Sequence, residues 1–259
     1  MSQVLIEGDG GIATLWLNRP DLHNAFDDGL IAEVTRAIDA LASDAAVRVV
    51  ILAGKGKSFS AGADLAWMKR MAGYSFEQNE ADANRLAEML HKLNTMSKAT
   101  IAAVQGAAMG GGVGLCAACD IGIASSDAVF ALSEAKLGLI PAVISPYVIE
   151  AIGARAARRY MLTAERFDAA AAERLGLVSA VVAPDQLMAE ARRIAEILLQ
   201  NGPQAVREAK ALVAHVSGRE NDAGLRAETA RRIARLRATP EGREGVAAFL
   251  EKRKPSWRG

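Results

Sequence analysis

Two short apolar segments, each leading into a glycine-containing loop, constrain the fold of this chain most. Residues 47–53 (VRVVILA) and 100–105 (TIAAVQ) have the composition of strands buried on both faces of a sheet. A further strand is expected at 12–17, and apolar residues recur at helical spacing over 27–41 and 77–96. This alternation predicts an α/β fold with a largely parallel sheet. In such sheets, ligands usually bind at the carboxyl ends of the strands, where the two loops would lie.

Beyond residue 130 the pattern shifts towards helix. Asp168 is a good N-cap for one helix, Pro184 opens another, and Gly202-Pro203 separates that helix from the next. The last sixty residues contain no convincing strand. We therefore expect a core over residues 1–200 that carries the ligand site, followed by a helical segment over 201–259.

Charge and composition exclude several classes of protein. The 259 residues include 31 Lys and Arg against 30 Asp and Glu, a formal net charge of +1, which argues against a nucleic-acid footprint. No apolar run reaches the roughly 20 residues that cross a bilayer. The amino terminus lacks a basic stretch followed by an apolar one, as a secretory signal would have. We expect a cytoplasmic protein that binds neither nucleic acid nor membrane.

Four catalytic or cofactor motifs are incomplete or absent. Cys116 and Cys119 form a CxxC in an apolar run, with no second pair or nearby histidine to complete a zinc site, so we expect buried thiols. Residues 54–58 (GKGKS) end like a phosphate-binding loop but lack its first glycine. The three histidines show no HExxH spacing, and no GxSxG accompanies them. We expect no metal and no redox cofactor.

The segment 107–141 combines three consecutive glycines at the start of an apolar helix with one glutamate, Glu134. Glycine lets backbone N–H groups approach a ligand closely, and a helix amino terminus favours developing negative charge. Glu134, with Leu132 and Leu137 near it in sequence, is a candidate proton-transfer group. The pattern indicates enolate chemistry, in which amides hold an oxyanion and one carboxyl group moves the proton.

Several pieces in one order resemble the crotonase (enoyl-CoA hydratase/isomerase) superfamily from about residue 4 to the carboxyl terminus. They are Asn18-Arg19-Pro20 with Asn24-Ala25, and the segments 59–65 (FSAGADL), 104–115 (VQGAAMGGGVGL), 119–125, 130–141 and 171–182. The resemblance implies a spiral of ββα repeats, with a helical C-terminal segment used in trimerisation and commonly a dimer of trimers. It also implies an acyl-CoA substrate, with CoA entering as the thioester and no separate cofactor.

By motif position, the resemblance implies an oxyanion hole formed by the amides of Ala63 and Gly111, with Glu134 as the acid/base. The residues that it places around CoA or the acyl chain are Ala25, Ser60, Ala61, Asp64, Leu65, Gly110 and, from a neighbouring subunit, Lys252. Asp64 is expected to fix the start of a helix and not to take part in chemistry. Trp67 and Met68 are expected either in the acyl pocket or in the core.

One departure from the family pattern leaves the reaction open. Typical hydratases carry two glutamates, and here Gly114 stands at the first of these positions. Glu134 alone could serve a syn hydration or a Δ3-Δ2 double-bond isomerisation. Residues 132–177 resemble bacterial methylglutaconyl-CoA hydratases of leucine and isovalerate catabolism, which favours hydration of 3-methylglutaconyl-CoA. Isohexenylglutaconyl-CoA hydratase, isomerase and a non-catalytic acyl-CoA-binding protein are the alternatives.

Overall fold

The computed structural model describes residues 2–258, and its centre is a six-stranded sheet in the order β1-β2-β3-β4-β6-β9. The strands are β1 (Val4–Asp9), β2 (Ile12–Leu17), β3 (Val49–Gly54), β4 (Ala99–Val104), β6 (Ile121–Ser125) and β9 (Ala180–Val182). Only the first pair, β1 and β2, is antiparallel; the other neighbours run parallel. The prediction of a largely parallel α/β sheet is confirmed.

A second, three-stranded sheet lies beside the first in the order β5-β7-β8. Its strands are β5 (Ala107–Met109), β7 (Val129–Ala131) and β8 (Arg166–Asp168). The chain passes from β4 to β5 and from β6 to β7, so that successive passes add one strand to each sheet. After β3, Ser60 makes a single bridge to Ala108 of β5. The loops at the carboxyl ends of β3 and β4 are thereby brought together.

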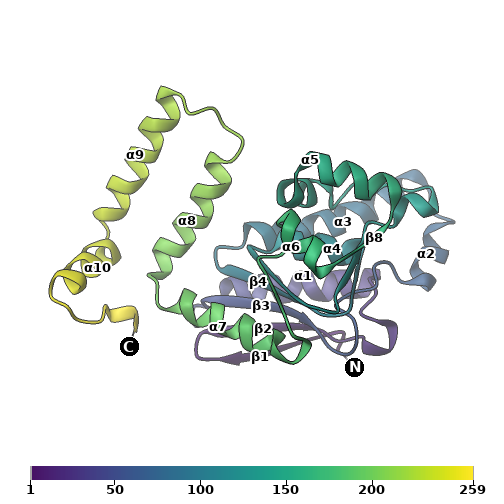
Figure 1. The fold of residues 1–259 in the computed structure, drawn as a ribbon, viewed down its shortest axis with the longest axis horizontal. Coiled ribbons are helices and arrows are strands. Elements are labelled where there is room, and N and C mark those ends of the chain that lie inside the picture. Colours follow the sequence, from purple (N-terminus) through teal and green to yellow (C-terminus); the bar gives the residue numbers. More distant parts are fainter. Residues whose placement is uncertain (1, 259) are drawn as a thin grey trace.

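Helices cover both faces of the large sheet (Figure 1). On one face lie α1 (Asp28–Ser43), α3 (Phe76–Thr95) and α4 (Gly111–Ala118), with α5 (Ser145–Thr163) packed on α4; on the other lies α7 (Leu187–Leu199). Alternate strand residues serve the two layers: Leu15 and Leu52 belong to the larger core, and Ile51 to the core under α7. Burial on both faces explains why the inner strands are apolar throughout.

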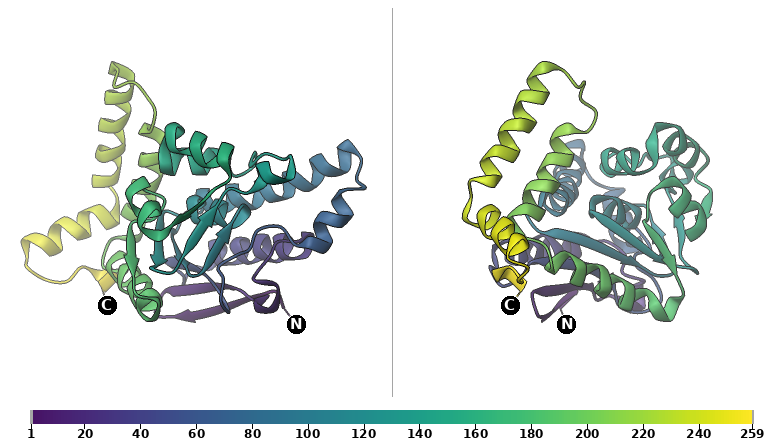
Figure 2. Two further views of the ribbon diagram at one scale, coloured as in Figure 1. Left: turned by 45° about the vertical axis from the view of Figure 1, so that its right-hand side comes forward. Right: turned by 60° about the vertical axis from the view of Figure 1, so that its left-hand side comes forward.

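After α7 the chain leaves the sheet. The chain continues as α8 (Pro203–Val216), which contacts β4, then α9 (Ala223–Arg237) and α10 (Pro240–Leu250), and α9 stands clear of the body in the views shown (Figures 1 and 2). Only Leu225 and Ala248 are buried among the residues of these three helices. The division of the chain at residue 200 stays a prediction about folding units, but the change in packing falls close to it.

Local signals were predicted with mixed success. Asp168 caps α6 (Ala169–Leu175) through the N–H of Ala171, as expected. Pro184, by contrast, opens a 3-10 turn (Pro184–Gln186), and α7 begins only at Leu187. The strand at 100–105 does not run directly into the glycines, because β5 intervenes.

Both cysteines are buried free thiols, and burial raises the pKa of Cys116 to about 12. None of the helices within residues 2–258 combines the length and the apolar character that crossing a bilayer requires.

Candidate active site

The two glycine-containing loops are joined by backbone hydrogen bonds. The N–H of Ser60 donates to the carbonyl of Ala107 at 3.0 Å, and the N–H of Met109 donates to the carbonyl of Ser60 at 2.9 Å. The Ser60 side chain is fully buried, and its hydroxyl donates to the carbonyl of Asn24 at 2.9 Å. Ser60, predicted to contact CoA, therefore also holds three backbone segments in one place.

Two of the glycines are required by close approach. A Cβ on Gly112 would lie 2.9 Å from the Ser60 carbonyl oxygen, inside the contact distance of a real side chain. Gly110 has a φ of +49°, and a Cβ there would lie 2.9 Å from Oε1 of Glu134. The glycine cluster is therefore explained by loop packing and by the approach of one carboxyl group.

Phe26 lies between the two predicted oxyanion donors. Its backbone pairs with the loop around Ala63: the N–H of Phe26 donates to Gly62 O at 2.7 Å, and the N–H of Asp64 donates to Phe26 O at 2.8 Å. Its ring packs against Gly111, where an added Cβ would lie 3.1 Å from Cε2. The same buried residue thus contacts both segments that carry the predicted donors.

The two predicted oxyanion donors are not engaged by acceptors of the described chain. Within residues 2–258, the N–H groups of Ala63 and Gly111 make no hydrogen bond. Gly111 is the first residue of α4, so its N–H also lies at the positive end of a helix dipole. Two free amides beside one phenylalanine can polarise a carbonyl oxygen and hold the charge that develops on it.

Glu134 opens a 3-10 turn (Glu134–Leu137) next to the second donor. Its Oε2 is buried and has no hydrogen-bond partner in the part of the chain that the structure describes. Burial raises the pKa of this carboxyl group above its usual value. Leu132 is buried, but Leu137 is 58% exposed and does not enclose the carboxyl group. The arrangement brings a proton-transfer group and an amide pair together.

Ile144 occupies the space that a side chain at residue 114 would need. Gly114 is buried in α4, and a Cβ built there would lie 2.8 Å from the Ile144 Cβ and closer still to its Cγ2. Ile144 itself is 3% exposed. An apolar side chain therefore fills the space at residue 114, the position at which typical hydratases of the resembled family carry their first glutamate.

The other predicted residues lie at different distances from this centre. Ala25 and Asp64 are buried beside the Phe26–Ala63 bridge, Ala61 is exposed in the same loop, and Leu65 is 82% exposed. Lys252 follows α10, on the opposite side of the body from α2 (Leu65–Met71), which begins at the loop (Figure 1). Because Lys252 was predicted to act from a neighbouring subunit, its role stays a prediction.

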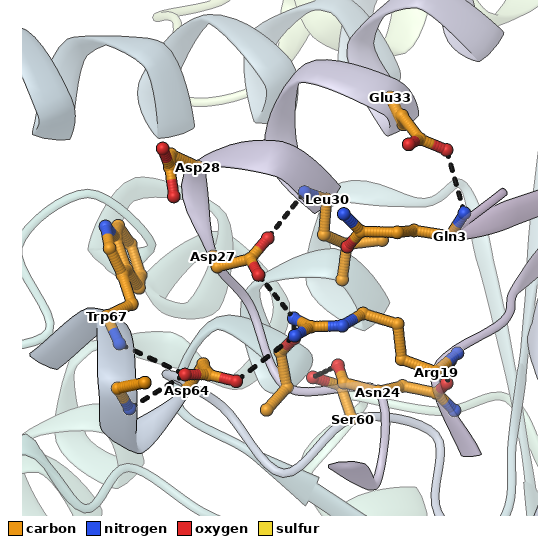
Figure 3. Close-up of polar contacts among 12 residues, drawn as sticks. Gln3, Arg19, Asn24, Asp27, Asp28, Leu30, Glu33, Ser60, Asp64 and Trp67 are labelled. Carbon is orange, nitrogen blue, oxygen red and sulfur yellow. Dashed lines mark hydrogen bonds and ion pairs between the residues drawn. The ribbon is translucent and has the colours of Figure 1, made fainter. Parts of the chain in front are cut away.

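Three side chains near the loops have structural roles. Lys55, which follows β3, pairs with Glu7 at 3.1 Å and lies 3.7 Å above the Trp16 ring. Trp67 is buried in the larger core. Asp64 accepts from the N–H groups of Ala66 and Trp67 and caps α2, as expected (Figure 3).

Sequence reasoning gave no role to Arg19, Asn24 or Phe26. Asn24 is fully buried: its Oδ1 accepts from the Arg19 N–H at 2.8 Å, and its Nδ2 donates to the carbonyl of Ser58 at 2.8 Å. A possible signal was the polar run directly after β2, because such a run at a strand end often positions a site.

Comparisons with known proteins agree with this geometry. A family model described as enoyl-CoA hydratase/isomerase matches residues 7–259. The structure of an enoyl-CoA hydratase from Shewanella pealeana is 47% identical with a TM-score of 0.96, over 98% of this chain and 96% of that one. A structure from Legionella pneumophila, provisionally named enoyl CoA hydratase/isomerase (crotonase), is 46% identical with a TM-score of 0.95, over 99% of both chains. Crotonyl-CoA hydratase from Syntrophomonas wolfei is 34% identical over 98% of this chain and 97% of that protein.

Proposed function

This chain belongs to the enoyl-CoA hydratase/isomerase family, and on that premise we propose that it hydrates 3-methylglutaconyl-CoA to 3-hydroxy-3-methylglutaryl-CoA. Family membership makes it an enzyme acting on acyl-CoA thioesters. The branched acyl group is the more specific part of the proposal. It is supported by the similarity of residues 132–177 to methylglutaconyl-CoA hydratases and, separately, by the glycine at residue 114.

The observation that carries the proposal is Glu134 beside two free amides. The amides of Ala63 and Gly111 would hold the thioester oxygen as it gains charge. Glu134 would accept a proton from water while the water oxygen adds to Cβ, and would then deliver a proton to Cα of the enolate. One carboxyl group is enough for both proton transfers, because Glu134 gains a proton from water and then gives a proton to Cα, and so ends the cycle ionised.

The isomerase alternative rests on Ile144. Its side chain fills the space beside Gly114, where typical hydratases carry a glutamate. No second carboxylate is therefore present there to hold a water molecule. Moving a proton from Cα to Cγ through the same enolate needs no water. Hydration and isomerisation would therefore use the same Glu134 and the same amides, and only the substrate separates them.

Turnover of three thioesters tests the proposal. Purified enzyme is compared on 3-methylglutaconyl-CoA, crotonyl-CoA and a 3-enoyl-CoA under identical conditions. We expect the highest kcat/KM with the branched thioester. Activity confined to the 3-enoyl thioester would assign the enzyme to the isomerases, and binding without turnover of any of the three would leave a non-catalytic protein.

We also propose that the enzyme works in the cytoplasm as a homotrimer or homohexamer. The C-terminal helices leave large apolar side chains uncovered: Val213, Val246, Phe249 and Leu250 are each more than half exposed. Light scattering should give a solution mass three or six times the 27.3 kDa of one chain. A mass of one chain at micromolar concentration would contradict the assembly, and Lys252 would then lose its proposed place at a neighbour's site.

A further inference from the structure

Arg19 contacts three residues beside the predicted oxyanion donor Ala63. Its guanidinium lies between Asp27 and Asp64, with Nη1 3.0 Å from Asp27 Oδ2 and Nη2 3.2 Å from Asp64 Oδ2 (Figure 3). Nη1 also donates to the carbonyl of Ala25 at 2.6 Å. The three side chains are only 11–19% exposed, so this is an inner cluster and not a surface ion pair.

These contacts bracket the segment that carries one predicted oxyanion donor. Ala25 immediately precedes Phe26, and Asp64 immediately follows Ala63. Phe26 and Ala63 are the two residues joined by the isolated bridge. Arg19 therefore binds both of the segments that this bridge joins. It donates to the carbonyl of Ala25 in one segment and pairs with the carboxylate of Asp64 in the other.

The partners of Arg19 cap the two helices that leave this segment. Asp27 accepts from the N–H of Leu30 at 2.7 Å at the start of α1, and Asp64 caps α2 through Ala66 and Trp67. Without the guanidinium, two partly buried carboxylates would face each other across the loop. Like charges in such a place repel, and each would also lose a charge-assisted hydrogen bond. The loop carrying Ala63 would then shift to separate them.

We propose that Arg19 is a positioning residue that fixes the direction of the Ala63 amide. The inference rests on the proposed function, because it takes Ala63 as an oxyanion donor. Arg19 does not touch the substrate in this role. A planar guanidinium can serve the carbonyl and both carboxylates at once, whereas a lysine ammonium is a single point of charge and cannot span them.

Kinetics of Arg19→Lys and Arg19→Gln, on the best substrate of the three thioesters, provide the first test. A misplaced amide weakens an interaction made in the transition state, so we expect kcat to fall about 10- to 100-fold with KM changed less than about threefold. Arg70 offers a matched control, since it pairs with Asp28 at 2.6 Å between α2 and α1 but is half exposed. Arg70→Lys and Arg70→Gln should leave kcat within about twofold.

A spectroscopic measurement separates positioning from loss of stability. The probe is butyryl-CoA labelled with 13C at the thioester carbonyl, a saturated compound that cannot be hydrated. Binding to the wild type should move the carbonyl resonance downfield, because the amides polarise it. The Arg19 variants should bind the probe with a smaller shift, and the Arg70 variants with the full shift. If Arg19→Gln fails to fold, Arg19→Lys carries the measurement.

The outcomes distinguish this inference from the proposed function. Folded Arg19 variants with unchanged kcat and an unchanged carbonyl shift would overturn the role of Arg19 while leaving the oxyanion site intact. An unshifted carbonyl in the wild type would overturn the oxyanion site, and the role of Arg19 with it.

Discussion

Replacing Glu134 by glutamine is expected to lower kcat about 10²- to 10⁴-fold, the usual contribution of a general acid/base. Glutamine has nearly the same shape and packs against Gly110 in the same way, but it cannot exchange a proton. Affinity for the thioester should change little, because the amides of Ala63 and Gly111 remain. The measurement is kcat together with exchange of the Cα protons of butyryl-CoA with deuterated water, which should stop in the variant.

Glu173→Gln is the control, since it makes the same chemical change on an exposed side chain of α6. It should leave both turnover and exchange unaltered. A Glu134→Gln enzyme that retained near-normal turnover would show that another group moves the proton. Loss of turnover together with loss of thioester binding would instead indicate a damaged pocket.

The pH profile has a definite sign. Burial raises the pKa of Glu134, and hydration needs the ionised form to accept a proton from water. Activity should therefore rise with pH through a value above that of an ordinary glutamate, about 4.3. The folded state holds this proton more tightly than the unfolded state does. Relative to Glu134→Gln, the wild type should accordingly be most stable at low pH and lose that stability as pH rises through the raised pKa.

The sequence predicts the parts of the site that depend on local chemistry. Consecutive glycines after an apolar segment indicate close backbone approach wherever they occur, and the structure shows that approach between Gly112 and Ser60. A single glutamate about twenty residues after the glycines could likewise be predicted from the sequence as the proton-transfer group. Strands β3 and β4 were equally predictable, because burial on both faces leaves an apolar run, whereas the inner strand β6 was not predicted. Strand β1 was missed because it is an edge strand, with all but its first residue exposed.

What the sequence could not predict are contacts between distant segments. Arg19 reaches Asp64 across 45 residues of chain, and nothing near either residue indicates the other. Ile144 reaches Gly114 only because α5 packs on α4. The sequence showed only that a glycine replaces a glutamate at residue 114. It did not show whether the pocket still has space for a glutamate side chain. The packing of Ile144 answers that question.

Gly114→Glu is expected to destabilise the enzyme and give no gain in hydration. The new side chain must displace Ile144 at its first carbon, and overpacking of this kind costs about 1–3 kcal/mol. Its carboxyl group would also be forced into a buried apolar site, where an unpaired negative charge is unfavourable. For a domain of this size, 1 kcal/mol lowers Tm by about 2–4 °C. We therefore expect a large loss of Tm or insoluble protein, measured by thermal unfolding.

Removing part of Ile144 isolates the cause. Ile144→Ala alone leaves a cavity and should cost about 2–5 kcal/mol. Gly114→Ala combined with Ile144→Ala should be more stable than the sum of the two single changes predicts, because the truncation removes Ile144 Cγ2, the atom nearest the new Cβ, and leaves only the Cβ of residue 144 at 2.8 Å. Additive changes in Tm would mean that the two residues do not compete for one space.

The same pair of positions then tests the single-carboxylate design. In Gly114→Glu with Ile144→Ala, the closest obstructing atom, Ile144 Cγ2, is gone, and only the Cβ of residue 144, at 2.8 Å, must still shift for two carboxyl groups to hold the attacking water. If the apolar wall is what limits hydration of simple enoyl thioesters, this variant should hydrate crotonyl-CoA faster than Ile144→Ala alone, under conditions where both are folded. An equal or lower rate would mean that Glu134 with the two amides already provides the full hydration chemistry, and that Ile144 shapes the acyl pocket instead.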